Sequence, residues 1–200
     1  MAKGPAPPAG FASRPLVVHR EPVGRMWQRL YETKHTNPLG FGLAPSRFSD
    51  PTAAAFGVVY LASSVKVAFH EVILRDRADA RSGAVLIGWA EIEGYTCAEI
   101  AVVSELKLVN LTGDGPLKMG VPSDVAGARD QTLAQQWSAA FHAHPDRVDG
   151  VYYPSRLNEE RNIALYDRAL HKVRVGRTPR LLDLRNPVAV IINDFELEIR

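Results

Sequence analysis

The sequence predicts an α+β fold, a compact single domain with a mixed, mostly antiparallel β-sheet core and flanking helices. Short runs rich in β-branched and aromatic residues recur along the chain, and only a few intervals between them carry a helical pattern. The chain has 200 residues, of which 46% are hydrophobic and 23% charged, so it can bury one sizeable core.

The beginning of the chain differs in composition from the rest. Residues 1–15 hold four prolines and two glycines, which predicts a flexible arm rather than a packed element. Residues 16–200 are expected to form the domain. No internal repeat is visible in them.

The first strand is expected over residues 26–31. Side chains alternate along a strand, so Trp27, Arg29 and Tyr31 share one face. Glycine and proline then mark residues 36–57 as a loop.

A second strand and a helix follow this loop. The strand covers residues 58–61 and carries Tyr60 near its end. Ser63 or Ser64 can cap a helix that runs to about Arg75. Apolar residues at helical spacing support the helix, and Glu71 lies within it.

The same signals place the remaining elements. Expected strands are residues 85–92, 96–103, 106–111, 150–153, 188–192 and 195–199, expected helices are 130–142 and 158–170, and an expected loop is 113–122.

Composition excludes several classes of protein. Lys+Arg total 24 and Asp+Glu total 22, so the formal net charge of +2 indicates no nucleic acid and no membrane surface as a direct partner. Cys97 is the one cysteine, so no intrachain disulfide forms. The chain lacks both an apolar run of about 18 residues and a signal-peptide pattern. We therefore expect a cytoplasmic protein.

The common catalytic and cofactor motifs are also missing. The chain has no phosphate-binding P-loop, no dinucleotide-binding glycine motif, no His-Glu-x-x-His and no Gly-x-Ser-x-Gly. Cys97 has no nearby cysteine or histidine in metal-ligand spacing. We expect no metal site.

Polar residues remain at unusual places, and each has a purely structural alternative. Arg29 could be an ion-paired strand residue, and Glu71 could form a surface pair with Arg75. Ser155 could be a turn residue, and Tyr60 a core residue.

Taken together, the motifs occur in an order that resembles the RES domain family. The motifs are Arg29-x-Tyr31, Asn37-Pro38-Leu39, Ser46-Arg47-Phe48-x-Asp50-Pro51, Gly57-x-x-Tyr60, Ala68-Phe69-x-Glu71 and Gly150-x-x-Tyr153-x-Ser155-Arg156. Many members carry Gly-Gly-Arg-Trp where this chain has residues 45–48, which leaves Arg47 in place. Arg20 and Arg25 are alternative first arginines, and Arg29 is preferred because of the motifs that follow it.

The resemblance implies a fold like that of ADP-ribosyltransferases and an enzyme that cleaves the nicotinamide–ribose bond of NAD+. NAD+ would be the substrate, so no separate cofactor is expected. Phosphate, water or a protein could accept the ADP-ribosyl group, which means an NAD+ phosphorylase, a glycohydrolase or an ADP-ribosyltransferase. Members are toxins opposed by an antitoxin, usually Xre-like and DNA-binding. The sequence does not fix the oligomeric state, and a homo-oligomer is compatible with it.

The chemistry of the reaction suits these residue types. Glu71 can stabilise the oxocarbenium ion, with Arg29 beside it as the second catalytic residue. Arg29 and Arg47 suit a pyrophosphate or phosphate, and Arg156 could also bind phosphate. Tyr31 or Tyr60 could stack on nicotinamide, and Ser155 could hydrogen-bond the substrate. The predicted site therefore consists of Glu71, Arg29, Arg47, Tyr31, Tyr60 and Ser155.

A basic segment supports a different class of function. Residues 168–185 hold six arginines and lysines and one acid, Asp183. They could be a solvated face, a steering patch for anionic partners, or the surface of a non-enzymatic basic binding module.

Overall fold

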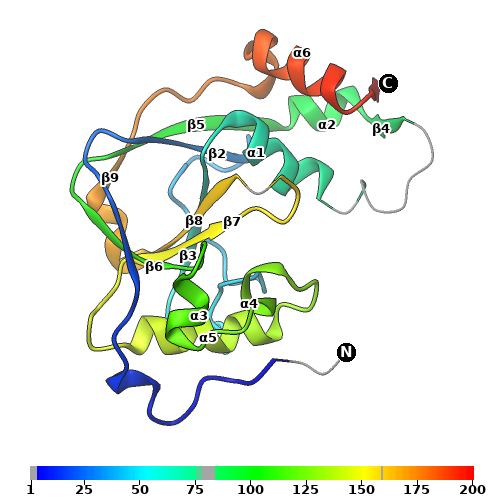
Figure 1. Cartoon of the computed structure of the whole chain (residues 1–200). Helices are drawn as coiled ribbons and strands as arrows, with labels where there is room; N and C mark the ends of the chain where they lie inside the picture. The colour runs from blue at the N-terminus through cyan, green and yellow to red at the C-terminus, as the bar shows by residue number, and fades with distance from the viewer. Residues whose placement is uncertain (1–3, 76, 78–83, 159) are drawn as a thin grey trace.

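A curled sheet of eight strands forms the centre of the computed structural model, which describes residues 4–75, 77, 84–158 and 160–200. In chain order its strands are β1 (Val18–Glu21), β2 (Met26–Glu32), β3 (Val58–Ala62), β5 (Tyr95–Val102), β6 (Leu106–Asn110), β7 (Gly150–Pro154), β8 (Arg161–Tyr166) and β9 (Val173–Val175). Their order across the sheet is β1-β6-β7-β8-β3-β2-β5-β9 (Figure 1). The β6–β7 pair is parallel and the other neighbouring pairs are antiparallel, which confirms the predicted fold class.

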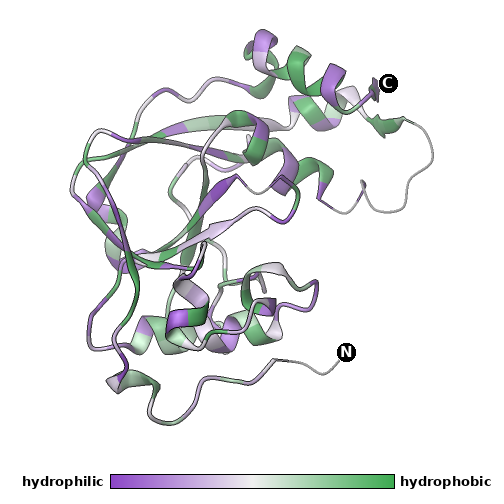
Figure 2. Ribbon diagram, viewed as in Figure 1, coloured by the Kyte–Doolittle hydropathy of each residue, from purple (hydrophilic) through white to green (hydrophobic). Residues whose placement is uncertain are grey.

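Helices cover the two ends of this sheet. They are α1 (Val65–Phe69), α2 (Trp89–Glu93), α3 (Gly115–Met119), α4 (Asp124–Gly127), α5 (Thr132–Ala143) and α6 (Arg185–Asp194). Helices α3, α4 and α5 gather at one end with the N-terminal segment, and α2 and α6 gather at the other (Figure 1). There β4 (Val85–Ile87) pairs in parallel with β10 (Leu197–Ile199). Both α5 and α6 carry hydrophobic and hydrophilic stretches, as amphipathic helices do (Figure 2).

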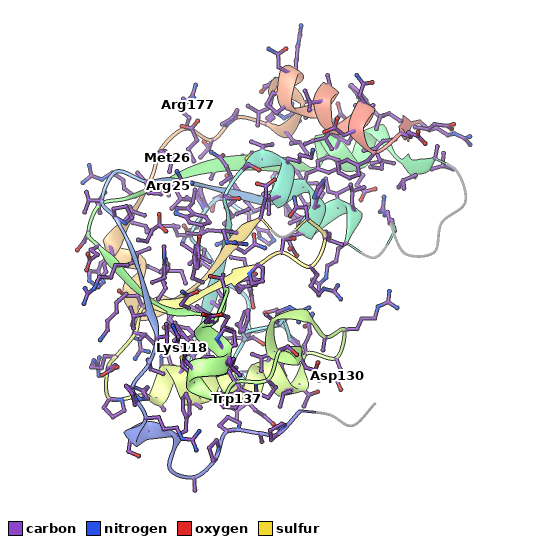
Figure 3. The ribbon with its side chains drawn as sticks, viewed as in Figure 1. Arg25, Met26, Lys118, Asp130, Trp137 and Arg177 are labelled. Atoms are coloured by element: carbon purple, nitrogen blue, oxygen red, sulfur yellow. The ribbon has the colours of Figure 1, made fainter. Side chains whose placement is uncertain are left out.

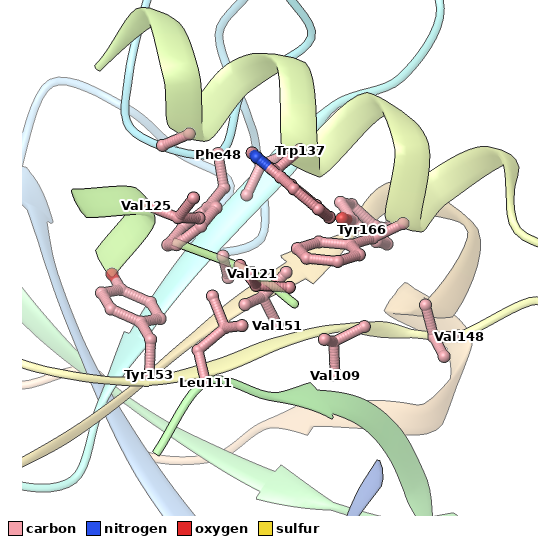
Figure 4. Close-up of a cluster of buried hydrophobic side chains, with 14 of the residues drawn as sticks. Phe48, Val109, Leu111, Val121, Val125, Trp137, Val148, Val151, Tyr153 and Tyr166 are labelled. Atoms are coloured by element: carbon pink, nitrogen blue, oxygen red, sulfur yellow. The ribbon is translucent and has the colours of Figure 1, made fainter. Parts of the chain in front are cut away.

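Three clusters of buried side chains fill the interior. One lies between the sheet and α5, where Phe48, Trp137 and Tyr166 are fully buried (Figure 4). A second lies under α1 and α6, and a third lies within the curl of the sheet around Trp27. Members of all three clusters, among them Tyr153, Leu30 and Leu61, line one cavity.

Helix α1 begins as predicted and then widens. The Ser64 Oγ accepts a hydrogen bond from Val67 N at 3.2 Å, so Ser64 is the N-cap. After Phe69 the chain continues as a π-helical turn, η2 (His70–Leu74). Single π turns are rare and are frequently found at functional sites. The predicted helix from Ser64 to about Arg75 is therefore confirmed, with one wide turn that carries Glu71.

Four predicted elements are wrong, and the reasons are physical. The expected strand 85–92 ends at Ile87 and α2 follows it, and the expected loop 113–122 contains α3. Where a helix over 158–170 was expected, residues 161–170 form β8 and the first part of a 3-10 segment, η3 (Asp167–Lys172). The expected strand 188–192 lies in α6. Short apolar runs cannot be assigned to helix or strand by periodicity alone. Strand β8 is buried on both faces, so its sequence lacks the alternation of a half-exposed strand.

Smaller differences concern the ends of predicted elements and a few short elements that were not predicted. The expected strand 195–199 is shortened to β10, and β1 and β9 were not predicted. A further 3-10 turn, η4 (Leu181–Asp183), precedes α6. The other predicted strands and the helix over 130–142 are confirmed to within a few residues.

The N-terminal segment packs against the domain, although we expected an unpacked arm. A short 3-10 turn, η1 (Phe11–Ser13), inserts Phe11, which is 3% exposed. Its ring lies edge-on to Trp137, with 5.0 Å between ring centroids. The Trp137 Nε1 donates a hydrogen bond to Pro5 O at 3.0 Å, on the side of α5 that faces this segment (Figure 3). The expectation is wrong because one phenylalanine supplies the apolar area that the prolines lack.

The long loop 36–57 is held in place by buried polar contacts. Ser138 Oγ donates to Phe48 O at 2.7 Å, and Gln135 Nε2 donates to Ser46 O at 3.0 Å, both from α5. The Asp50 carboxylate accepts hydrogen bonds from Thr52 Oγ1 and from the backbone of residues 52, 54 and 55. Burial by itself raises the pKa of Asp50, but these hydrogen bonds dominate together and lower it to about 2.

We predict that Asp50→Asn destabilises the protein by about 2 kcal/mol at pH 7, because an amide NH2 would face the backbone N–H donors. A carboxylate whose folded pKa is lowered from 3.8 to about 2 stabilises the fold above about pH 4, and this contribution is lost as the pH falls toward 2. The difference between the Asp50→Asn variant and the wild type in denaturant unfolding should therefore shrink below pH 4. The exposed Asp114→Asn is the control, and an equal effect in both variants would contradict the prediction.

We also predict that Phe11→Ala lowers the free energy of unfolding by about 3 kcal/mol, because it empties a packed site against Trp137. Val23→Ala truncates a side chain that is 62% exposed and should change stability by no more than about 0.5 kcal/mol. Chemical denaturation of both variants measures the difference. Equal stability of the Phe11 variant and the wild type would show that the N-terminal contacts do not hold in solution.

Candidate active site

A cavity of about 240 Å³ opens where β2, β3, β7, β8, η2 and the loop 36–57 meet. The chemically important residues that line it are Arg29, Arg47, Tyr60, Glu71, Arg75, Tyr153, Arg156 and Asn162. Four of the six residues predicted from the sequence therefore share one cavity, although they lie far apart along the chain.

Glu71 is the acid of the cavity, and Asn162 holds it. The π turn presents Glu71 to the cavity, and the Asn162 Nδ2 donates a hydrogen bond to Glu71 Oε1 at 3.0 Å. Asn162 is 2% exposed and lies on β8. Within the described residues Glu71 forms no salt bridge with Arg75, so the alternative of a surface pair is not observed.

Arg29 projects from β2 into the same cavity with one nitrogen unpaired. Its Nη2 donates to Gly40 O at 2.6 Å, whereas its Nη1 is buried without a hydrogen-bond partner among the described residues. Burial lowers the pKa of Arg29 to about 10, so the side chain is still charged at neutral pH. A buried guanidinium N–H without a partner is costly, and a bound anion would satisfy it.

Arg47 lies nearby, anchored by the end of α4. Its Nη1 donates to Ala128 O at 2.7 Å, and the residue is 8% exposed. Burial lowers the pKa of Arg47, and the positive charge of Arg156 lowers it further. Among the residues that the structure describes, no carboxylate pairs with Arg47, Arg75 or Arg156 within salt-bridge distance. Four guanidinium groups around one carboxylate make this a cavity for an anionic ligand.

Two tyrosines complete the wall. The Tyr60 OH accepts a hydrogen bond from Phe48 N at 2.8 Å and lies 2.9 Å from Ser46 Oγ, so the hydroxyl ties β3 to the loop that carries Arg47. Burial raises the pKa of Tyr60. Burial, and then the charge of Glu71, raise the pKa of Tyr153 well above its usual value. Both rings therefore stay neutral and present apolar faces.

The other predicted site residues lie outside this cavity. Tyr31 is half-buried on β2, on the same face as Arg29, but does not line the cavity. Ser155 is 2% exposed; its Oγ accepts a hydrogen bond from Leu157 N at 3.2 Å, and it lines a neighbouring cavity. Of the alternative first arginines, Arg20 pairs with Glu105, and Arg25 lies directly before β2 at the periphery of the molecule (Figure 3).

Three of the eight chemically important lining residues were not predicted to belong to the site. Arg75 was considered only as a surface partner of Glu71, although a spacing of four on a helix also allows both to face one cavity. Tyr153 was part of a motif without a role. Asn162 was missed because residues 158–170 were expected to be helical, whereas β8 places it beside β3.

The basic segment 168–185 takes part in contacts within the domain. Arg168 donates to Val148 O and His142 O, Lys172 pairs with Asp149, and Arg177 pairs with Glu99. Half of its positive charges are therefore used in contacts within the domain, which favours the interpretation as a solvated structural face.

Other reactive features are scarce in the described part of the chain. Cys97 is fully buried, and burial raises the pKa of its thiol to about 12, so a thiolate nucleophile is not available there. Within the described ranges no helix combines the length and the apolar character that crossing a bilayer requires.

Known proteins resemble this chain in sequence and in fold. The family model of the RES domain matches residues 23–184. A protein of Sinorhizobium fredii (strain NBRC 101917 / NGR234) named "Probable toxin y4kH" is 44% identical over 126 residues, which are 63% of this chain and 99% of that protein. A chain in the crystal structure of the M. tuberculosis MbcT–MbcA toxin–antitoxin complex has the same fold, with a TM-score of 0.62 and 17% identity over 90% of this chain and all of that one. The match of the family model over most of the chain shows that this protein belongs to the RES domain family.

Proposed function

We propose that this chain is a toxin-like enzyme that cleaves the nicotinamide–ribose bond of NAD+. The observation that carries the proposal is one carboxylate, Glu71, set among four guanidinium groups that line a single cavity. Membership of the RES family and the name of the S. fredii relative support it. The substrate would supply both a cationic reacting centre and an anionic pyrophosphate, which is the charge pattern that this cavity complements.

Glu71 would act on the reacting centre. The bond between the ribose carbon and the nicotinamide nitrogen breaks, and its electron pair leaves with nicotinamide. The ribose carbon becomes an oxocarbenium ion, which a nearby carboxylate stabilises. An oxygen of the acceptor then bonds to that carbon. The hydrogen bond from Asn162 fixes one carboxylate oxygen at 3.0 Å and leaves the other to face the ribose.

The arginines would hold the anionic part of the substrate. Arg29 offers a buried, unpaired Nη1, and Arg47 is fixed through its other contact to Ala128 O. Guanidinium groups bind phosphate oxygens in bidentate geometry, which orients the ribose against Glu71. The rings of Tyr60 and Tyr153 would flank nicotinamide, and Tyr31 remains a candidate farther along β2.

The positive charges of the cavity also indicate which molecule accepts the ADP-ribosyl group. An excess of positive charge attracts inorganic phosphate, which is an anion, more strongly than it attracts neutral water. We therefore propose phosphorolysis as the main reaction and hydrolysis as the slower one. A partner that inhibits the enzyme is part of the proposal, because the structural neighbour comes from a toxin–antitoxin complex. An Xre-like, DNA-binding antitoxin and a cytoplasmic location are proposed with it.

The purified protein and NAD+, with and without phosphate, test this function. Release of nicotinamide that increases with phosphate, together with ADP-ribose phosphate as a product, supports phosphorolysis. Free ADP-ribose alone would indicate hydrolysis. Radiolabelled NAD+ in a cell extract would label a protein band if the chain were an ADP-ribosyltransferase. No nicotinamide release under any of these conditions would contradict the proposal.

We predict that Glu71→Gln lowers kcat about 10²–10³-fold, because the amide cannot balance the positive charge of the oxocarbenium ion. The amide oxygen can still accept the hydrogen bond from Asn162, so the melting temperature should not change. Nicotinamide release and thermal unfolding measure the two effects. Full activity of this variant would remove the assigned role of Glu71.

We predict that Arg29→Lys lowers kcat/KM about 10–100-fold, because an ammonium group cannot both reach Gly40 O and bind a phosphate in bidentate fashion. Arg25→Lys is the matched control, since that side chain is 57% exposed, lies outside the cavity and should keep wild-type kinetics. The reverse pattern, with loss of activity only in the Arg25 variant, would show that Arg29 is not the first arginine of the family motif.

A further inference from the structure

A second cavity of about 520 Å³ lies beside the first, under α3 and α4. Its walls are mainly apolar and include Leu111, Pro116, Leu117, Val121 and Val125, with the hydroxyl-bearing Ser155 at one side. Leu117 is 82% exposed, so a large aliphatic side chain stands at the rim with little cover. The function proposed above does not use this cavity.

Two arginines mark the junction of the two cavities. Arg156 lines both of them. Arg47 lines the first, and its Nη1 donates to the carbonyl of Ala128, the residue directly after Gly127 in the wall of the second. The positive charge of Arg156 lowers the pKa of Arg47, which shows that the two charges act on each other. Two like charges at a junction, without a carboxylate between them, favour the binding of an anion.

The first cavity is small for a ligand of the size of a dinucleotide. Its volume of about 240 Å³ is below the ~300–1,000 Å³ of ordinary small-molecule sites. A dinucleotide carries two nucleosides joined by a pyrophosphate. Such a ligand fits two cavities with a cationic junction better than one cavity alone.

We infer that the second cavity binds the adenosine half of a dinucleotide whose nicotinamide riboside half occupies the first, and that Arg156 joins Arg29 and Arg47 in binding the pyrophosphate. This inference rests on the proposed function and extends it to substrate recognition. The adenine base is planar and largely apolar on its faces, and it would lie against Pro116, Leu117 and Val121.

Ser155 gains a role in this arrangement. Its Oγ accepts a hydrogen bond from Leu157 N, so its O–H remains available as a donor. It would donate to a ribose hydroxyl or a base nitrogen of the adenosine. The family motif around Ser155 would therefore serve the half of the substrate that does not react.

Two variants test the assignment by different means. Gly127→Trp adds a ring in the wall of the second cavity, where a Cβ built on the glycine meets no atom within 4 Å and the backbone needs no left-handed conformation. Leu117→Asp removes apolar wall and places a negative charge at the rim without disturbing the core. Val190→Asp is the matched control, because Val190 is 53% exposed on α6 at the other end of the molecule.

The readout is the ratio of two KM values, for NAD+ and for nicotinamide mononucleotide, which lacks the adenosine half. Both test variants should raise KM for NAD+ about tenfold more than KM for the mononucleotide, and the Val190 variant should leave the ratio as in the wild type. Equal changes for the two substrates, or an unchanged ratio in both test variants, would overturn the assignment.

Binding of AMP separates this inference from the proposed function. Calorimetry should show that the wild type binds AMP and that both test variants bind it about tenfold more weakly. A wild type that binds no AMP, or variants that bind it equally well, would overturn the adenosine subsite whether or not NAD+ is cleaved. The protein could also bind AMP, with weaker binding in both variants, and release no nicotinamide from NAD+. That result would support the adenosine subsite and contradict the proposed cleavage.

Discussion

The hydrogen bond between Asn162 Nδ2 and Glu71 Oε1 connects β8 to the π turn and fixes the one acid of the cavity among four guanidinium groups. Without a fixed position, the carboxylate could move toward Arg75, four residues away, and become neutralised by it. An acid that is already paired with an arginine would stabilise an oxocarbenium ion far less. The architecture around the site serves to keep Glu71 close to the positive charges and unpaired with them.

The loop 36–57 contributes the second half of this arrangement. It has no helix or strand of its own, yet Phe48 is fully buried and Arg47 is nearly so. Its order comes from outside, through Tyr60 on β3 and Ser138 and Gln135 on α5. It also comes from within, through the hydrogen bonds that Asp50 accepts from residues of the same loop. Long loops with such support usually carry function, and here the supported residue is an arginine that faces the cavity.

Sequence reasoning recovered the parts of this protein in which a local signal and the tertiary structure agree. Strand β2, strand β3, the capped α1 and helix α5 all have such signals, and the ordered family motifs placed Arg29, Arg47, Tyr60 and Glu71 in one site. Strand β8 failed because a strand buried on both faces shows no alternation, and the loss of β8 concealed Asn162. Ser155 lines the neighbouring cavity and not the first one, because of the direction that the chain takes after β7. The sequence motifs do not predict that direction.

The π turn has a consequence for how this family can tolerate changes in length. It contains one residue more per turn than an α-helix, and Glu71 within it and Arg75 directly after it both line the cavity. Deletion of a single residue between them would therefore restore regular α-helical geometry with little rotation of the segment beyond the deletion. The acid and the arginine would then be three residues apart on an α-helix and would still share one face. Homologues that keep the reaction should therefore tolerate the loss of one residue from this turn.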